Sequence, residues 1–327
     1  MKKVLASLAM AVGLVVVAIS NAWATDIKEI TIGYFQEWPT ANMVAMLDKT
    51  YDKEMGVKLN WRSFGNGNEM SAAMASGNLQ IAFSQGLVPF VVAVSKGLKI
   101  KMVSVAVSYA EADNCVVSKK SGITQANAKE LEGKKVGTSI GNVTHYKLLR
   151  MLKHLGVDAN KVDIVQMNAT DAAVAFARGD ITMGCGWGGG LLRMLKTGNL
   201  LMTAAEQEAL GIRVFDVVSV TDDFLNKHPD LVQKFIDVTD NANAAYAADP
   251  ASAMPKIAKA SGMDLADAKQ IIAMFTFPSK KDLASKAWFG GTIQKFTKQV
   301  AEFFVAQKQM DKALKDYGPT ITDRFVK

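Results

Sequence analysis

Short apolar runs typical of strands alternate with helical runs as far as Val220, and this alternation constrains the fold more than any other feature. In the first series, strand patterns at residues 30–34 and 57–64 flank a helical pattern at residues 42–55. A second series begins near Cys115, and only helical patterns follow Val220. Strands that alternate with helices form mostly parallel sheets covered by crossover helices. The sequence therefore predicts an α/β protein of two lobes, each a mixed, mostly parallel sheet flanked by helices.

The order of these patterns predicts that the chain crosses between the lobes twice. We expect residues 25–111 to form the first part of lobe I, residues 112–212 to form lobe II, and residues 213–327 to return to lobe I and end in helices. The two crossings would be hinge strands. A cleft between lobes joined by extended segments suits the capture of a ligand by hinge closure.

The first 24 residues have the pattern of a secretory signal peptide. Lys2 and Lys3 precede an apolar run at residues 4–19, and small residues, Ala22 and Ala24, occupy the positions that a signal peptidase reads. An uncleaved anchor is the alternative, but a bilayer span needs roughly 20 apolar residues. We expect cleavage after Ala24 and export to the periplasm.

Composition and charge favour a folded protein that binds small molecules. The chain is 49% hydrophobic and 21% charged, which suffices for a packed core. Its net charge is +7, but no block of Lys and Arg is longer than a pair. A mildly basic surface favours either anionic solutes or an anionic membrane face. We expect no nucleic-acid partner and a monomer.

The two cysteines, Cys115 and Cys185, have two readings. An exported pair can form a disulfide. Each one, however, stands among apolar or small residues, where cysteine behaves as a small buried hydrophobe. We favour two free buried thiols, with the disulfide as the alternative. Neither they nor the histidines have the spacing of metal ligands, so we expect no metal and no cofactor.

Catalytic motifs give no support for an enzyme. The sequence has no GxSxG motif and no Walker loop. The glycines at residues 184–190 lack the Lys and Ser or Thr that complete a phosphate-binding loop.

Two strand-to-helix connections offer binding groups. Residues 141–145 carry a hydroxyl at Thr144, and residues 84–87 have the same position in lobe I. Helix N-termini present N–H groups to anions. An ordinary helix cap is the alternative for each connection.

Aromatic and acidic residues add to these connections. Trp38 and Trp187 follow predicted strands in loops, which favours a ligand-facing role over burial. Asp216 stands inside an apolar run, where a charge costs several kcal/mol unless it is paired. Its partner would be either a ligand ammonium or a protein Lys or Arg.

The chain resembles the taurine-binding proteins of ABC importers over nearly all of its length beyond the signal peptide. The matching segments are residues 60–62, 75–81, 144–146, 148–149, 152–156, 178–181, Trp187, 215–217, 223–224, 227–229, Tyr317 and 324–326. The resemblance implies a type II periplasmic-binding fold and a membrane ABC permease as partner. It further implies that Thr144 and neighbouring N–H groups hold a sulfonate, that Trp187 walls the pocket, and that Asp216 and Glu37 meet an ammonium.

Four departures from the family surround the predicted pocket. The loop at residues 83–88 is one residue longer, with Gln85 and Gly86 where the family has serines. Asn114 replaces a Glu, three glycines follow Trp187 in place of Ala-Pro, and Trp38 has no counterpart.

The exact solute therefore has alternatives, namely taurine or a related zwitterionic sulfonate, another alkanesulfonate, or a quaternary ammonium compound. A further alternative, an enzyme resembling the thiamine-pyrimidine synthases, would need a cysteine-rich motif that this sequence lacks. The predicted ligand-binding residues are Gln36, Glu37, Trp38, Gln85, Gly86, Asn114, Asn142, Val143, Thr144, His145, Trp187 and Asp216.

Overall fold

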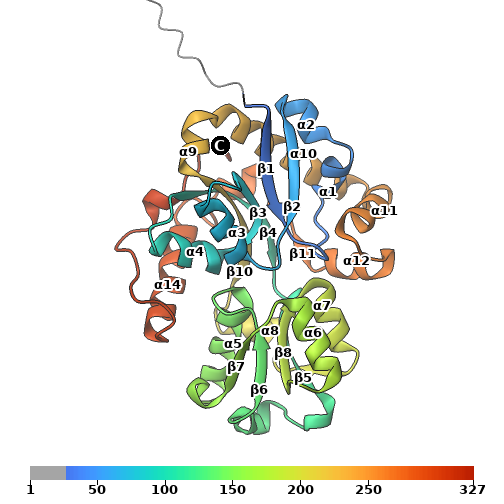
Figure 1. The fold of residues 1–327 in the computed structure, drawn as a ribbon, viewed down its shortest axis with the longest axis vertical. Coiled ribbons are helices and arrows are strands. Elements are labelled where there is room, and N and C mark those ends of the chain that lie inside the picture. Colours follow the sequence, from blue (N-terminus) through green and yellow to red (C-terminus); the bar gives the residue numbers. More distant parts are fainter. Residues whose placement is uncertain (1–26) are drawn as a thin grey trace, which may run out of the picture.

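The computed structural model describes residues 27–327, which form two α/β lobes, a larger one above a smaller one in Figure 1. The predicted signal peptide lies outside these residues. Every helix among residues 27–327 is too short or too polar to cross a bilayer. The predicted fold class, two mixed sheets flanked by helices, is confirmed. The expectation that the sheets are mostly parallel is wrong, because antiparallel pairs equal or outnumber parallel pairs in both sheets.

The larger lobe, lobe I, is built on a six-stranded sheet with the order β11-β4-β10-β3-β1-β2. Its strands are β1 (Glu29–Tyr34), β2 (Lys58–Ser63), β3 (Ile81–Gly86), β4 (Ile100–Tyr109), β10 (Val214–Thr221) and β11 (Phe275–Thr276). β1 runs parallel to β2 and β3, whereas β10 is antiparallel to both of its neighbours. β10 is buried along almost its whole length, so a residue on it lies deep in the lobe.

Helices cover both faces of this sheet. They are α1 (Met43–Leu47), α2 (Thr50–Met55), α3 (Gly67–Ala75), α4 (Leu87–Ser95), α9 (Asp222–Lys227), α10 (Pro229–Ala248), α11 (Pro250–Ser261), α12 (Leu265–Ile272), α13 (Lys280–Leu283) and α14 (Thr292–Ala306). One core cluster includes Phe90, Phe215 and Phe304, and another includes Tyr51 and Phe235. The helix predicted at residues 42–55 is broken into α1 and α2, because Lys49, which precedes α2, adopts a left-handed conformation.

The smaller lobe, lobe II, has a five-stranded sheet with the order β7-β6-β8-β5-β9. Its elements are β5 (Asp113–Ser118), β6 (Lys135–Thr138), α5 (Val143–His154), β7 (Asp163–Gln166), α6 (Ala169–Arg178), β8 (Met183–Trp187), α7 (Gly188–Leu195), β9 (Gly198–Leu200) and α8 (Ala204–Ala209). β6 is parallel to β7 and β8, and β5 is antiparallel to β8 and β9. The apolar faces of α5 and α6 pack on this sheet.

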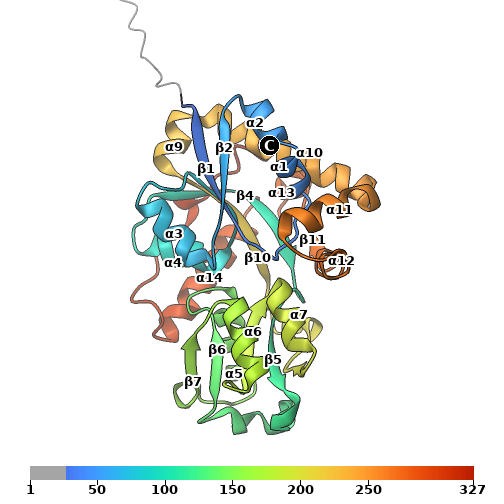
Figure 2. The same ribbon diagram turned by 45° about the vertical axis from the view of Figure 1, so that its right-hand side comes forward.

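Two short crossings join the lobes. The chain leaves lobe I between β4 and β5, through residues 110–112, and returns between α8 and β10, through residues 210–213. Figure 2 shows both crossings in the narrow region where the lobes meet. Short connections of this kind permit hinge motion of one lobe against the other.

Cys115 and Cys185 form a disulfide, so the interpretation of two free thiols is wrong. They stand opposite each other in the antiparallel pair β5–β8, with their Cα atoms 3.9 Å apart. The separation of 70 residues along the chain hid this proximity, because only the sheet register brings the two thiols together. The disulfide is fully buried in the core of lobe II.

Candidate functional site

A small cavity lies between the lobes, beside the hinge crossings. Its volume is about 20 Å³, room for about one water molecule. It is lined by Phe35, Trp38, Gly86, Tyr109 and Asp216 from lobe I and by Asp113, Asn142, Val143 and Trp187 from lobe II. Six of the twelve residues predicted from sequence therefore line one cavity, namely Trp38, Gly86, Asn142, Val143, Trp187 and Asp216.

The lobe I wall presents a buried carboxylate, Asp216, on β10. The Ser84 hydroxyl donates to one of its oxygens at 2.7 Å, and the Tyr109 hydroxyl donates to the other at 2.8 Å. The Trp38 indole N–H donates in turn to the Ser84 oxygen at 3.0 Å. The carboxylate is thus fixed in orientation by neutral donors.

No Lys or Arg among residues 27–327 forms an ion pair with Asp216. Burial raises the pKa of Asp216 to about 7, the hydroxyls of Ser84 and Tyr109 oppose this rise, and nearby Asp113 adds to it. Of the two partners that the sequence left open, the internal basic residue is therefore absent from the described part of the chain.

A second buried carboxylate, Asp113, begins β5 on the lobe II wall. The β5–β8 register places it opposite Trp187, two residues from the disulfide on both strands. Its Oδ1 atom is buried, and no group within residues 27–327 donates a hydrogen bond to it. The chain context Ala-Asp-Asn gave no signal for this residue, because nothing in it separates a cavity acid from a surface one.

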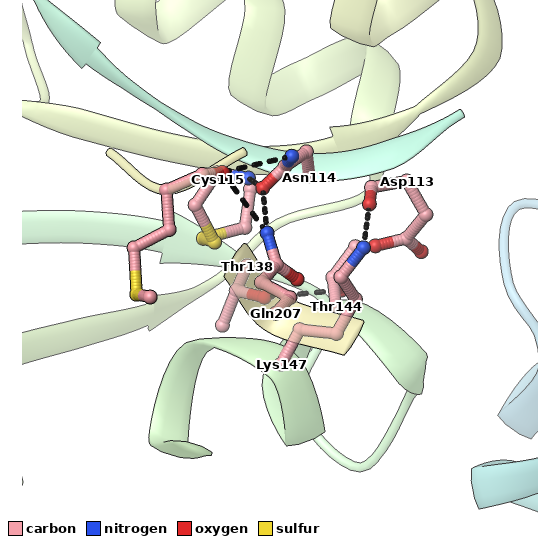
Figure 3. Close-up of a disulfide and its surroundings, with 9 residues drawn as sticks. Asp113, Asn114, Cys115, Thr138, Thr144, Lys147 and Gln207 are labelled. Carbon is pink, nitrogen blue, oxygen red and sulfur yellow. Dashed lines mark hydrogen bonds between the residues drawn. A yellow bond between two sulfur atoms is a disulfide. The ribbon is translucent and has the colours of Figure 1, made fainter. Parts of the chain in front are cut away.

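A buried lysine lies behind Asp113. Lys147, on α5, donates from its ammonium to the backbone carbonyls of Ala110 and Asp113, the second of which is visible in Figure 3. Burial raises the pKa of Asp113, while the Lys147 charge opposes this rise. Lys147 therefore offsets charge near the cavity and ties α5 to the first hinge crossing.

The N-terminus of α5 faces the cavity through Asn142 and Val143. The first amides of a helix have no intrahelical acceptor, and the Asn142 side chain supplies no capping bond within the described residues. Its Oδ1 instead accepts from the Gly67 amide of lobe I at 3.1 Å. This wall offers N–H donors and the positive end of a helix dipole, which suit an anion.

The Thr144 hydroxyl does not reach the cavity. It turns into lobe II and pairs with the Thr138 hydroxyl at 3.1 Å, as Figure 3 shows. The next residue, His145, accepts from the Gly141 amide at 3.2 Å, and burial lowers its pKa to about 4. Neither residue lines the cavity, so the groups of this turn that could meet an anion are its backbone N–H groups.

Two further predicted residues form hydrogen bonds inside their own lobes. Gln85 donates to the Gly67 carbonyl at 3.1 Å. Asn114 accepts from Gln207 at 2.8 Å and donates to the Met202 carbonyl at 3.2 Å. Both are fully buried and lie outside the cavity lining, so we no longer expect them to contact a solute.

Gln36 and Glu37 stand at the mouth of the cleft. Gln36 donates to the Tyr34 hydroxyl at 2.9 Å. Glu37 accepts two bonds of 2.8 Å from the Arg193 guanidinium of lobe II. The carboxylate implied for Glu37 as an ammonium partner is thus already paired with the protein.

Aromatic side chains close the rest of the cavity. Trp38 meets Tyr109 edge-on, with ring centroids 5.0 Å apart, and Phe35 packs near Trp187 at 6.0 Å. Gly86 lets the lobes approach, because a Cβ there would lie 2.8 Å from the Val143 side chain. Neither Phe35 nor Tyr109 was predicted from the sequence, although Phe35 directly follows the predicted strand at residues 30–34, and ligands bind at such strand ends.

The cavity brings groups that suit an anion close to groups that suit a cation. One wall supplies amide donors for an anion, and two buried carboxylates supply acceptors for a cation. Both cysteines are held in the disulfide, so neither supplies a thiol nucleophile. Among residues 27–327, no cluster of His, Cys, Asp or Glu could hold a metal ion.

Two α/β lobes joined by two crossings, with a small cavity between them, define the fold of the periplasmic solute-binding proteins. The chain belongs to the NMT1/THI5-like family, whose profile matches residues 40–253.

Relatives and solved structures agree with this assignment. The chain is 28% identical to the taurine-binding periplasmic protein of Escherichia coli (strain K12) over 311 residues, which cover 93% of this chain and 95% of that protein. It is 27% identical over 222 residues to an aliphatic sulfonates-binding protein of Bacillus subtilis (strain 168), covering 66% of this chain and 65% of that protein. The alkanesulfonate-binding protein SsuA of Xanthomonas axonopodis pv. citri, solved bound to MOPS, superimposes with a TM-score of 0.74 at 21% identity over 90% of this chain and 98% of that one.

Proposed function

We propose that this chain is the solute-binding protein of an ABC importer and captures taurine or a closely related zwitterionic sulfonate in the cavity between its lobes. One observation carries the proposal. Asp216 is a buried carboxylate with no basic partner in the described residues, and it shares a small cavity with the uncapped N-terminus of α5. A solute with one positive and one negative end satisfies both walls.

The sulfonate would accept hydrogen bonds from the first backbone amides of α5. The ammonium would donate to Asp216 and to the unpartnered oxygen of Asp113. Aromatic faces add roughly 0.5–2 kcal/mol of cation–π attraction when the cation is desolvated. Trp38, Tyr109 and Trp187 would supply these faces and exclude water.

The cavity must widen to admit such a solute, because about 20 Å³ is less than its volume. Hinge opening at residues 110–112 and 210–213 would provide the space, and closure would mark the loaded state for a membrane permease. We further propose that the signal peptide is cleaved, that the mature protein acts in the periplasm as a monomer, and that it releases its solute without chemical change.

The four aromatic residues of the cavity favour a second candidate, a quaternary ammonium solute. The oxygen of Asp113 argues against it, because a quaternary ammonium has no N–H to donate. Calorimetric titration with taurine, ethanesulfonate and choline separates the candidates. We expect taurine to bind most tightly, with ethanesulfonate about 100-fold weaker because Asp216 then stays unpaired. Tighter binding of choline would support the second candidate, and binding of none of the three would overturn the sulfonate assignment.

A further inference from the structure

The glycines that follow Trp187 permit an unusually close approach of lobe I to lobe II. A Cβ on Gly188 would lie 2.1 Å from the Glu37 carbonyl oxygen, and a Cβ on Gly189 would lie 2.8 Å from the Glu37 carboxylate. The Gly189 amide instead donates to that carbonyl at 3.3 Å. A side chain at Gly188 would overlap the lobe I backbone and push the lobes apart, whereas one at Gly189 would displace the end of the Glu37 side chain.

Glu37 makes contacts on both sides of the cleft. Its backbone has a left-handed φ of 54°, and its amide donates to the Ser261 carbonyl at the end of α11 in lobe I, at 2.9 Å. Its carboxylate and carbonyl both face α7 of lobe II, where they meet Arg193 and Gly189. Glu37, which is held in lobe I, therefore forms hydrogen bonds to the first and last turns of α7, an eight-residue helix of lobe II.

The Glu37–Arg193 contact differs from the other ion pairs. Among those formed within residues 27–327, it alone joins the two lobes. Its bidentate geometry fixes orientation as well as distance. It flanks the mouth of the cleft, a pocket of about 350 Å³ that shares Phe35 and Trp187 with the inner cavity.

Amide side chains also join the two lobes. Asn66 donates to the Asn168 side chain at 2.8 Å, and Asn68 donates to the Ile140 carbonyl at 2.9 Å. Amides of this kind exchange readily for water, with a small net free energy. Asn168 also donates across the lobes to the Glu69 carboxylate, at 3.3 Å. The Glu37–Arg193 contact differs from all these bonds in pairing two opposite charges in bidentate geometry.

We propose that Glu37, Gly188, Gly189 and Arg193 form a latch that holds the lobes closed, so that solute retention depends on residues that do not touch the solute. The latch rests on the proposed function only in that closure serves solute capture. Loss of the latch should shorten the dwell time of the closed state without altering either wall of the cavity.

Single-molecule energy transfer between dyes on the two lobes tests the latch directly. Non-canonical amino acids at Lys53 of lobe I and Lys120 of lobe II, both exposed, would carry the dyes and leave the disulfide intact. We expect Glu37→Gln to shorten the closed dwell time about fivefold, with or without taurine, as for a partly exposed ion pair. Gly188→Ala should shorten it more than tenfold, because the overlap is with backbone.

Each variant has a matched control. Asp48→Asn breaks an ion pair of similar exposure, Lys256–Asp48, that lies within lobe I. Gly179→Ala carries the same left-handed strain as Gly188→Ala, but a Cβ there meets nothing within 4 Å. Both controls should keep the wild-type dwell time.

The two proposals fail separately in this experiment. Dwell times of Glu37→Gln and Gly188→Ala that equal those of their controls would overturn the latch. A wild-type protein whose closed dwell time taurine does not lengthen would instead overturn the solute assignment, while the variants still report on the latch.

Discussion

The two walls of the cavity use different chemistry. On the lobe I wall, both oxygens of Asp216 already accept hydrogen bonds, from Ser84 and Tyr109. On the lobe II wall, the first amides of α5 lack a cap and one oxygen of Asp113 lacks a donor within residues 27–327. The lobe I wall is thus organised before a solute arrives, whereas the lobe II wall is completed by the solute.

Because of this difference, we expect the two walls to contribute unequally to solute affinity. A carboxylate that is held in place loses little conformational freedom on binding, so its interaction contributes more to affinity. Unpaired groups on the other wall carry a desolvation cost that a solute removes. We therefore expect substitutions on the lobe I wall to have larger effects on affinity than those on the lobe II wall.

The largest effect should follow from Asp216→Asn. The amide keeps partners for Ser84 and Tyr109 but loses the charge, so taurine should bind about 100-fold more weakly, or about 3 kcal/mol. Ethanesulfonate, which has no cation, should lose little. Calorimetry on both solutes measures the contrast, and equal losses would defeat the assignment of Asp216 to the ammonium.

The next effect should come from pH. The pKa of Asp216 is raised to about 7 by burial, and the ammonium needs the ionised form. Taurine should therefore bind roughly tenfold more weakly at pH 6 than at pH 8, and ethanesulfonate should not. His145 stays neutral over this range because its pKa is lowered to about 4. The other titratable groups beside Asp216 are Tyr109 and Asp113. Burial raises the pKa of Asp113 as well, and the charge of Lys147 opposes that rise.

The pH dependence of folding stability has the opposite sign to that of taurine binding. A carboxylate whose pKa is raised in the folded state destabilises the protein as pH rises from about 4 to about 7. Without solute, the contribution of Asp216 to the free energy of unfolding should therefore be most favourable at low pH. The difference between the wild type and Asp216→Asn in denaturant unfolding at pH 5 and pH 8 measures it, and a flat difference would contradict the raised pKa.

A smaller loss should follow from Asp113→Asn. The variant keeps an oxygen that accepts a hydrogen bond, so only the charge is lost, and taurine affinity should fall about fivefold, or about 1 kcal/mol. Titration of the single and double variants with Asp216→Asn gives their coupling. A loss larger than that of Asp216→Asn would invert the comparison of the two walls.

The smallest effect on affinity, about twofold, should come from Cys115→Ala combined with Cys185→Ala. The disulfide fixes the β5–β8 register that places Asp113 opposite Trp187, but the strand hydrogen bonds remain. Lobe II should lose about 4 kcal/mol of stability, as expected for a closed loop of this length. Differential scanning calorimetry should then separate an early transition of lobe II from an unchanged transition of lobe I. A single shifted transition would show that the lobes unfold together.

The fold was predictable because its signals are local. Alternating apolar runs marked the strands and helices of both lobes, and the buried run around Asp216 marked a charge that needs a partner. The left-handed residue Lys49, which breaks one predicted helix into two, left no such pattern. Pairings between distant strands, such as Cys115 with Cys185, depend on sheet register and were not visible.

The site was predictable only in part for the same reason. Sequence motifs mark side chains, so Thr144 drew attention, although its hydroxyl pairs with Thr138 and this turn lines the cavity through Asn142 and Val143. Glu37 was singled out as a cavity acid, but folding brings Arg193 against it from the other lobe. Asp113 lay in an uninformative segment, and only the crossing between lobes carries it to the cavity.

A crystal structure grown with taurine is the most direct test of how the two walls divide the solute. We predict sulfonate oxygens within about 3 Å of the first backbone amides of α5 and the amino nitrogen at a similar distance from Asp216. A solute bound in the reverse orientation, or outside this cavity, would contradict the account.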